Sequence, residues 1–181
     1  MSELPVIHGR KLSRNEIKTI WSIDRSEVIE AVYYLEGGAL VLKPEHYDMG
    51  GWPPGESEKY TSILEACYDR GGWFYALFDG EQVAGAAILE SRFIGKNQDQ
   101  LQLKFLHVSR RYRQQGFGRR LFDLAAEEAR KRGAKSLYIS ATPSKNTIDF
   151  YLGLKCRLTS QPDPELLELE PEDIHLEFDL G

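Results

Sequence analysis

The chain has 181 residues, of which 41% are hydrophobic and 28% are charged, and its formal net charge at pH 7 is −5. This length and composition are typical of one globular domain, residues 1–181, and exclude a disordered chain, a collagen and a coiled coil. No apolar run approaches the roughly 20 residues that a membrane-spanning helix needs. The first residues do not resemble a signal peptide, so we expect a cytoplasmic protein without a membrane partner.

The first half of the chain is predicted to form two helices and two hairpins. Ser13 and Glu16 have the spacing of a capping box and predict that a helix follows them. The other predicted elements are a hairpin of Val28 to Leu35 and Ala39 to Leu42, a loop from Asp48 to Gly55, a helix from Glu56 to Arg70, and a hairpin of Trp73 to Phe78 and Gln82 to Glu90.

The predicted strand from Gln100 to Val108 contains a shift in its alternation. Apolar residues occupy every second position from Leu101 to Phe105, but the next ones are Leu106 and Val108. One residue has been added to the pattern. The shift indicates either a β-bulge, which is often found beside an active site, or a strand that is buried on both faces.

The second half of the chain indicates a crossover between two parallel strands. A helix from Gly118 to Arg132 separates the bulged strand from a strand at Ser136 to Ala141, and such a unit is right-handed. The remaining elements are a short helix capped by Ser144 and two closing strands, Lys155 to Thr159 and Ile174 to Leu180. Hairpins, one crossover and a final strand pair predict an α+β fold with a mixed sheet.

Positive charge is concentrated where this crossover begins. Residues 104–135 carry a net charge of +7, which leaves −12 on the rest of the chain. Inside this block, Gly116 and Gly118 precede a helix N-terminus, whose free N–H groups bind anions. The turn is not a Walker loop, and Leu121 occupies the third glycine position of a dinucleotide-binding fingerprint. The sequence therefore does not favour a P-loop fold or a dinucleotide-binding fold.

The segment from Val108 to Gly118 resembles the acyl-CoA-binding signature of the GNAT superfamily of N-acetyltransferases, V-x-P-x-[YF]-R-x-x-G-x-G. The similarity continues in Leu106-His107-Val108 and in Asn146 followed by Phe150-Tyr151. It implies a mixed, mostly antiparallel sheet with a splayed, bulged strand and flanking helices. It also implies transfer of an acetyl group from acetyl-CoA to a primary amine on a small molecule, a peptide or a lysine, and it allows a homodimer.

The resemblance implies a set of residues for each role. Tyr151 would protonate the departing CoA thiolate, and Glu90 would act as a base through water, although a charged residue at a strand end is also commonly just solvated. Arg110, where the family has proline, and Gln114, where it has glycine, depart from the pattern. The residues implied to bind acetyl-CoA are Leu106, His107, Val108, Arg113, Gln114, Gln115, Gly116, Phe117, Gly118, Arg119 and Asn146.

Other functions fit the sequence less well. A domain that binds acyl-CoA as a sensor or scaffold without turnover would share the signature. Nucleic-acid binding is disfavoured by the pI of about 5.5. The two cysteines are 89 positions apart and no H-E-x-x-H motif occurs, so we expect no metal.

Two segments are candidates for the walls of the acceptor site. Asp163 to Asp173 contains six acidic residues and no basic one. It would attract a cationic amine, or it is an ordinary solvated loop. Gly50-Gly51-Trp52 would form the opposite wall, or Trp52 packs its loop against the core.

Overall fold

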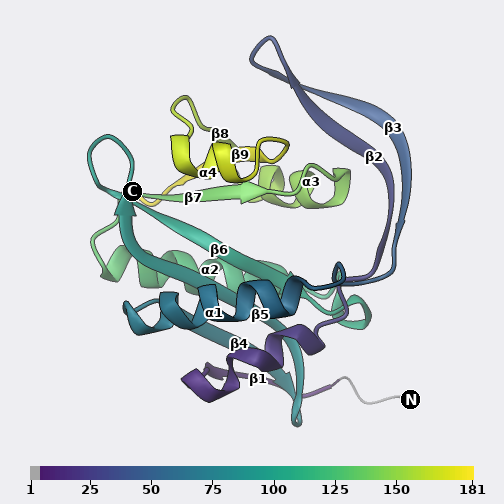
Figure 1. The fold of residues 1–181 in the computed structure, drawn as a ribbon, viewed down its shortest axis with the longest axis vertical. Helices are drawn as coiled ribbons and strands as arrows, with labels where there is room; N and C mark the ends of the chain where they lie inside the picture. Colours follow the sequence, from purple (N-terminus) through teal and green to yellow (C-terminus); the bar gives the residue numbers. More distant parts are fainter. Residues whose placement is uncertain (1–4) are drawn as a thin grey trace.

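A seven-stranded sheet in the order β1-β4-β5-β6-β7-β9-β8 forms the centre of the computed structural model, which describes residues 5–181 (Figure 1). The strands are β1 (Ile7–Lys11), β4 (Trp73–Asp79), β5 (Gln82–Ile94), β6 (Gln100–Val108), β7 (Ser136–Ala141), β8 (Arg157–Leu158) and β9 (Ile174–Asp179). Only β6 and β7 pair in parallel, and every other pair in the sheet is antiparallel. The predicted mixed, mostly antiparallel α+β fold is confirmed.

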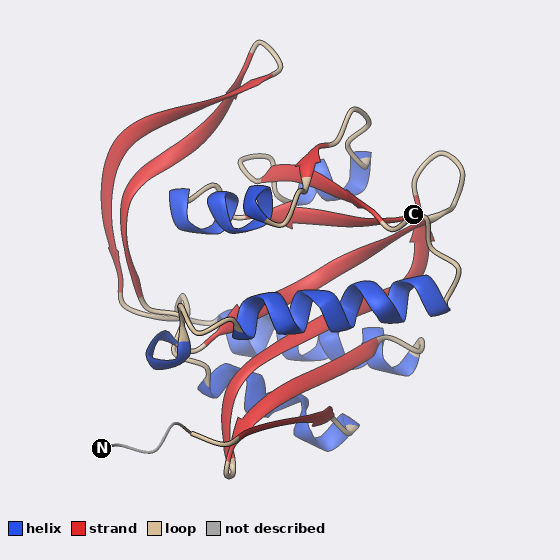
Figure 2. Ribbon diagram, turned by 180° about the vertical axis from the view of Figure 1, so that it is seen from behind, coloured by secondary structure: helices blue, strands red, loops and turns tan. Residues whose placement is uncertain are grey.

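Helices cover both faces of this sheet. The helices are η1 (Arg14–Ser22), α1 (Glu56–Asp69), η2 (Arg110–Tyr112), α2 (Phe117–Lys131), α3 (Lys145–Gly153) and α4 (Pro164–Leu169). Side chains of η1 and α1 pack in one core cluster, and those of α2 and α3 pack in another on the opposite face. Figure 2 shows α2 crossing the face that lies behind the sheet in Figure 1.

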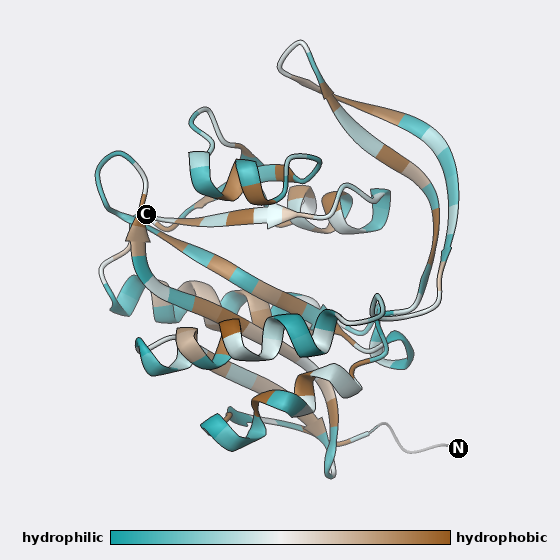
Figure 3. Cartoon of the chain, viewed as in Figure 1, coloured by the Kyte–Doolittle hydropathy of each residue, from teal (hydrophilic) through white to brown (hydrophobic). Residues whose placement is uncertain are grey.

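Strand β5 is buried on both faces, which explains why it contains the longest apolar run of the chain. Ala84 and Ala87 face the cluster of α2, whereas Ala86 and Ile88 face the cluster of η1 and α1. Figure 3 shows the apolar residues concentrated on the central strands, with hydrophilic colour on the outer faces of the helices. A strand covered on both sides cannot alternate between apolar and polar residues.

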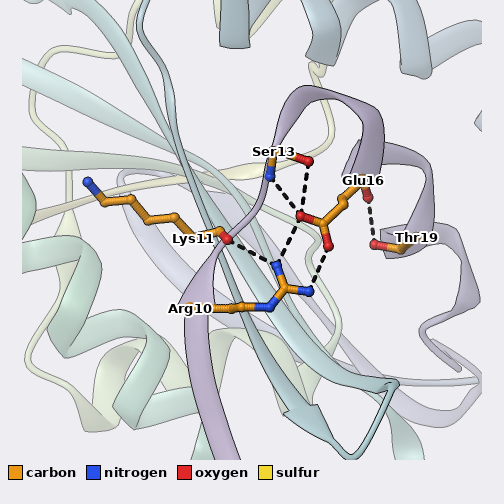
Figure 4. Close-up of polar contacts among 5 residues, drawn as sticks. All are labelled: Arg10, Lys11, Ser13, Glu16 and Thr19. Atoms are coloured by element: carbon orange, nitrogen blue, oxygen red, sulfur yellow. Dashed lines mark hydrogen bonds and ion pairs between the residues drawn. The ribbon is translucent and has the colours of Figure 1, made fainter.

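The predicted helix after Ser13 is present but winds as a 3₁₀ helix, η1. Ser13 donates from both its N–H and its Oγ to Glu16 Oε1, each at 3.0 Å, and Arg10 donates to both oxygens of the same carboxylate (Figure 4). Hydrogen bonds from Arg10 and from the Ser13 N–H lower the pKa of Glu16 to about 2. The capping box therefore also fastens η1 to β1.

The first predicted hairpin is a separate two-stranded sheet of β2 (Glu27–Glu36) and β3 (Ala39–Met49). It is longer than predicted because β3 continues through Pro44 with a bulge in the pairing. The hairpin arches past α3 in Figure 1. It is anchored there by the Tyr33 N–H, which donates to Pro143 O at 2.8 Å, and by the Tyr33 hydroxyl, which donates to Asp149 Oδ1 at 2.6 Å.

Three further elements differ from their predicted bounds. Strand β5 continues to Ile94 past an irregularity in its pairing, and β8 has only two residues. The predicted acidic loop contains α4, where the Asp163 side chain accepts a hydrogen bond from the Leu166 N–H.

No helix within residues 5–181 is long and apolar enough to cross a membrane.

Candidate active site

The parallel pair β6 and β7 is joined over three residues and then separates. Gln100, Leu101 and Gln102 pair with Ser136, Leu137 and Tyr138, and the two strands then diverge, as Figure 2 shows. A cavity of about 590 Å³ opens where they part. We call its strand-lined part the open seam, formed by residues 103–108 of β6 and residues 139–142 at and beyond the end of β7.

A bulge in β6 lies at the start of the open seam. Ile88 of β5 pairs with Phe105 and Leu89 pairs with Leu103, which leaves Lys104 without a partner on β5. The bulge absorbs the shift that the sequence shows. Leu101 and Leu103, and after the bulge Leu106 and Val108, pack on the face of α2, whereas Phe105 packs on the face of η1 and α1.

Main-chain groups of β6 point into the seam. The Ser109 N–H donates to Ala84 O of β5 at 2.8 Å, so Ser109 directs its main-chain N–H toward β5. Because these groups alternate sides along a strand, those of Val108 and Leu106 point away from β5, toward the seam. Arg113 Nε donates to the Val108 carbonyl oxygen at 2.9 Å. The N–H groups of Leu106 and Val108 have no main-chain partner on β7, because the pairing of β6 with β7 ends at Gln102.

At the other end of the cavity lies the glycine turn, residues 113–119. Within residues 5–181, the main-chain N–H groups of residues 114–119 donate no hydrogen bond. The first N–H of the helix that donates is that of Arg120, which bonds to Gly116 O at 3.0 Å. Gly116 has a φ of 84° and Gln114 has a φ of 61°. Consecutive free N–H groups at a helix N-terminus form a site for an anion such as a pyrophosphate.

The side chain of Arg113 has a structural role that the sequence did not reveal. Its guanidinium donates to the carbonyl oxygens of Ser26 at 2.8 Å and Asp24 at 3.0 Å, in addition to Val108. It therefore ties the glycine turn to the start of β2. Burial lowers the pKa of Arg113, which Glu27 and Asp24 partly offset. Arg119 also lines the cavity and forms no ion pair within the part of the chain that the structure describes.

Helix α3 brings Asn146 and Tyr151 to the cavity. Tyr151 is 6% exposed and packs against the rings of Phe122 and Phe150, with centroid distances of 6.2 and 5.1 Å. Burial, and to a smaller extent the thiol of Cys156, raises the pKa of Tyr151. Its hydroxyl makes no hydrogen bond to any residue that the structure describes. The phenol is therefore a protonated donor at neutral pH that faces the cavity.

Glu90 does not line the cavity. It lies where β5 bulges opposite β6, is 6% exposed, and accepts hydrogen bonds from Arg70 Nη2 and the Ser91 N–H at 2.9 Å each, with Lys104 Nζ at 3.8 Å. Burial acts to raise its pKa, but the Ser91 hydrogen bond and the cations Arg70 and Lys104 outweigh it, so the pKa is lowered. These contacts make Glu90 a weak base, and they fasten the bulge.

Most of the predicted binding residues meet at the cavity. Gln115 and Phe117 do not line it, because Gln115 donates to Arg111 O and Phe117 packs on the core of α2. His107 lines it as a neutral ring, since burial and the charges of Arg25 and Arg113 lower its pKa to about 3.

Trp52 packs on the core, against Phe105 and His107, two residues that line the cavity. Its ring stacks on Phe105 with a centroid distance of 5.8 Å, and its Nε1 donates to Ile23 O at 2.9 Å. The loop therefore packs on the core, Trp52 itself does not line the cavity, and the role of this loop as a wall of the acceptor site stays a prediction. Sequence reasoning missed other cavity residues because they come from segments far apart in the chain and carry no motif. They include Arg25, Glu27, Ser140 and Asp149.

The chain was compared with known proteins. The model of the Acetyltransferase (GNAT) family matches residues 41–154. No curated protein sequence matches the chain. The structure of nourseothricin acetyltransferase is similar, with a TM-score of 0.71 and 16% identity over 97% of this chain and 99% of that one.

Two other solved structures are similar in the same way. The PaiA N-acetyltransferase of Thermoplasma acidophilum, in complex with coenzyme A, has a TM-score of 0.60 and 16% identity over 96% of this chain and 99% of that one. The IAA acetyltransferase of Bacillus cereus has a TM-score of 0.60 and 14% identity over 96% and 99%. Identities this low show a shared fold.

Proposed function

Since the chain belongs to the Acetyltransferase (GNAT) family, we propose that it transfers the acetyl group of acetyl-CoA to the nitrogen of a primary amine by direct attack. One observation carries the proposal. A single cavity has the glycine turn, with its free N–H groups, at one end and the open seam, with the Tyr151 phenol, at the other. An elongated donor with a pyrophosphate and a thioester needs these two kinds of groups at separate ends.

Each part of the cavity supplies one requirement of the reaction. The N–H groups of residues 114–119 bind the pyrophosphate, with Arg119 as a nearby cation. The pantetheine arm lies along β6 in the open seam, where Leu106 and Val108 direct N–H groups at the developing oxyanion. Tyr151 donates its proton to the departing thiolate.

The proposal is tested with the purified protein in two steps. Acetyl-CoA is titrated by calorimetry, and release of free CoA is then followed with a thiol-reactive dye in the presence of putrescine, spermidine, L-lysine or a peptide with a free N-terminus. We expect saturable binding and amine-dependent CoA release. Binding without release on any amine would support the non-catalytic sensor, and absence of binding would contradict both functions.

A further inference from the structure

Ser140 is a polar cavity residue that the reaction described above does not use. Its neighbours on β7, Ile139 and Ala141, point into the core of α2 and α3, so Ser140 points to the opposite face of the sheet. Its hydroxyl lies 2.8 Å from Asp173 Oδ2 and donates to it. An ionised carboxylate only accepts hydrogen bonds. The lone pairs of Ser140 Oγ are therefore left to accept from a donor in the cavity.

The carboxylate of Asp173 is hydrogen-bonded to Ser140 and to no Lys or Arg side chain that the structure describes. Asp173 directly precedes β9, is half-buried, and forms no ion pair within residues 5–181, in contrast to Glu90 with Arg70 and Lys104. Burial raises the pKa of Asp173, which the hydrogen bond from Ser140 and the nearby ring of His175 partly offset. The titratable groups around it are His175, Glu172 and Glu170.

The ring of His175 makes its hydrogen bonds to other residues. The Asp163 N–H donates to the Tyr138 hydroxyl at 2.9 Å, and the same hydroxyl lies 2.7 Å from His175 Nδ1. His175 Nε2 lies 3.3 Å from Glu170 O. Both ring nitrogens therefore have partners other than Asp173, whose side chain is hydrogen-bonded to the cavity residue Ser140.

We propose that Ser140 Oγ accepts a hydrogen bond from the nitrogen of the acceptor amine, and that Asp173 positions Ser140 for this contact and takes up the amine proton through it. The ammonium gives one proton to Ser140 Oγ while the Ser140 hydroxyl proton passes to Asp173 Oδ2. The products are a neutral amine, a regenerated serine and a protonated carboxyl group, so charge and protons balance. An alkylamine is mostly an ammonium at neutral pH, and this cationic form brings the proton that the pair takes up. This inference rests on the proposed function.

The test compares Asp173→Asn, Ser140→Ala and the double variant with the wild type, using whichever of putrescine, spermidine and L-lysine reacts fastest. We expect each single variant to lower kcat/KM for the amine by about 100-fold, with the double variant no worse than either single one. The Kd for acetyl-CoA is expected to be unchanged. Glu81→Gln, which changes an exposed carboxylate outside the cavity and outside the acidic segment, is the control and is expected to keep full activity.

The pH profile separates this role from a purely structural one. Activity of the wild type is lost as the pH falls through the raised pKa of Asp173, because protonation removes the acceptor of the Ser140 proton. Asp173→Asn is expected to lack this acidic limb. If Asp173→Asn does not fold, Ser140→Ala carries the test with the same readouts.

The outcomes distinguish failure of the inference from failure of the proposed function. A wild type that acetylates no amine would overturn both. The role of Ser140 and Asp173 alone would be overturned if the wild type is active and the two single variants keep its kcat/KM. It would also be overturned if they lower kcat/KM without changing the pH profile.

Discussion

The glycine turn and the open seam are two ends of one cavity, but they are built in different ways. The turn is a contiguous segment whose anion-binding groups are main-chain N–H donors, so almost any side chain leaves them intact. The seam needs β6, β7 and α3 to be held apart by a bulge, and its useful groups come from distant parts of the chain. Under the proposed function, we expect the first end to govern binding of the donor and the second to govern turnover.

The largest expected effect is at the seam. Tyr151→Phe removes the proton donor for the thiolate but keeps the packing against Phe122 and Phe150. We expect kcat to fall by about 100-fold to 1,000-fold and the Kd for acetyl-CoA to stay unchanged. Steady-state kinetics with calorimetry measures both. Tyr60→Phe, outside the cavity, is the control, and an unchanged kcat in Tyr151→Phe would show that water protonates the thiolate.

The next effect is at the glycine turn. Gly118→Pro removes one free N–H and presses on Phe150, since a Cβ at residue 118 would lie 3.1 Å from its ring. We expect the Kd for acetyl-CoA to rise by about 100-fold in a protein that still folds. Gly118→Ala keeps the N–H and adds only the crowding, so calorimetry on both variants separates the two causes. Equal affinity in Gly118→Pro would refute the N–H cradle.

Glu90 belongs neither to the glycine turn nor to the open seam, so its substitution tests a structural role. Glu90→Gln leaves Arg70 and Lys104 without their carboxylate, and we expect the free energy of unfolding to fall by about 2 kcal/mol while kcat/KM stays within a factor of a few. Because its folded pKa is lowered, this stabilisation is complete above the unfolded value of about 4.3 and is lost as the pH falls below it.

Chemical denaturation at pH 7 and pH 3.5 measures that loss for the wild type and for Glu90→Gln. The surface variant Glu81→Gln serves as the control. A kcat that drops by about 100-fold with normal stability would instead establish Glu90 as the catalytic base that the resemblance implies.

The smallest effect concerns the backbone of the turn. Gln114 has a left-handed backbone conformation, which costs a non-glycine residue about 1 to 2 kcal/mol. Glycine avoids this cost but increases the entropy of the unfolded chain, which cancels part of the gain in stability. Gln114→Gly is expected to stabilise the protein by about 0.5 to 1 kcal/mol in urea denaturation, without a change in acetyl-CoA affinity. Gln115→Gly, at a position without a positive φ, is expected to destabilise it slightly.

Local patterns determined much of the fold and one end of the cavity. The alternation of β6 indicated either a bulge or a strand buried on both faces, and the structure has the bulge. The two glycines predicted a turn before a helix N-terminus, and the family resemblance pointed to Asn146 and Tyr151, which line the cavity. Such features depend on neighbours within about ten residues, so they are legible in a single sequence. The departure at Gln114 is also explained, since its φ is one that glycine favours.

Tertiary structure alone decided which of two carboxylates lies beside the cavity. Glu90 and Asp173 are both acidic residues beside strands, but ion pairs with Arg70 and Lys104 hold Glu90 outside the cavity, whereas Asp173 meets a cavity residue through Ser140. The resemblance placed Arg113 among the residues that bind acetyl-CoA, and only the tertiary structure shows that its guanidinium donates to three carbonyl oxygens. Charge and polarity are properties of the sequence, but their partners are set by packing between segments that are far apart in the chain.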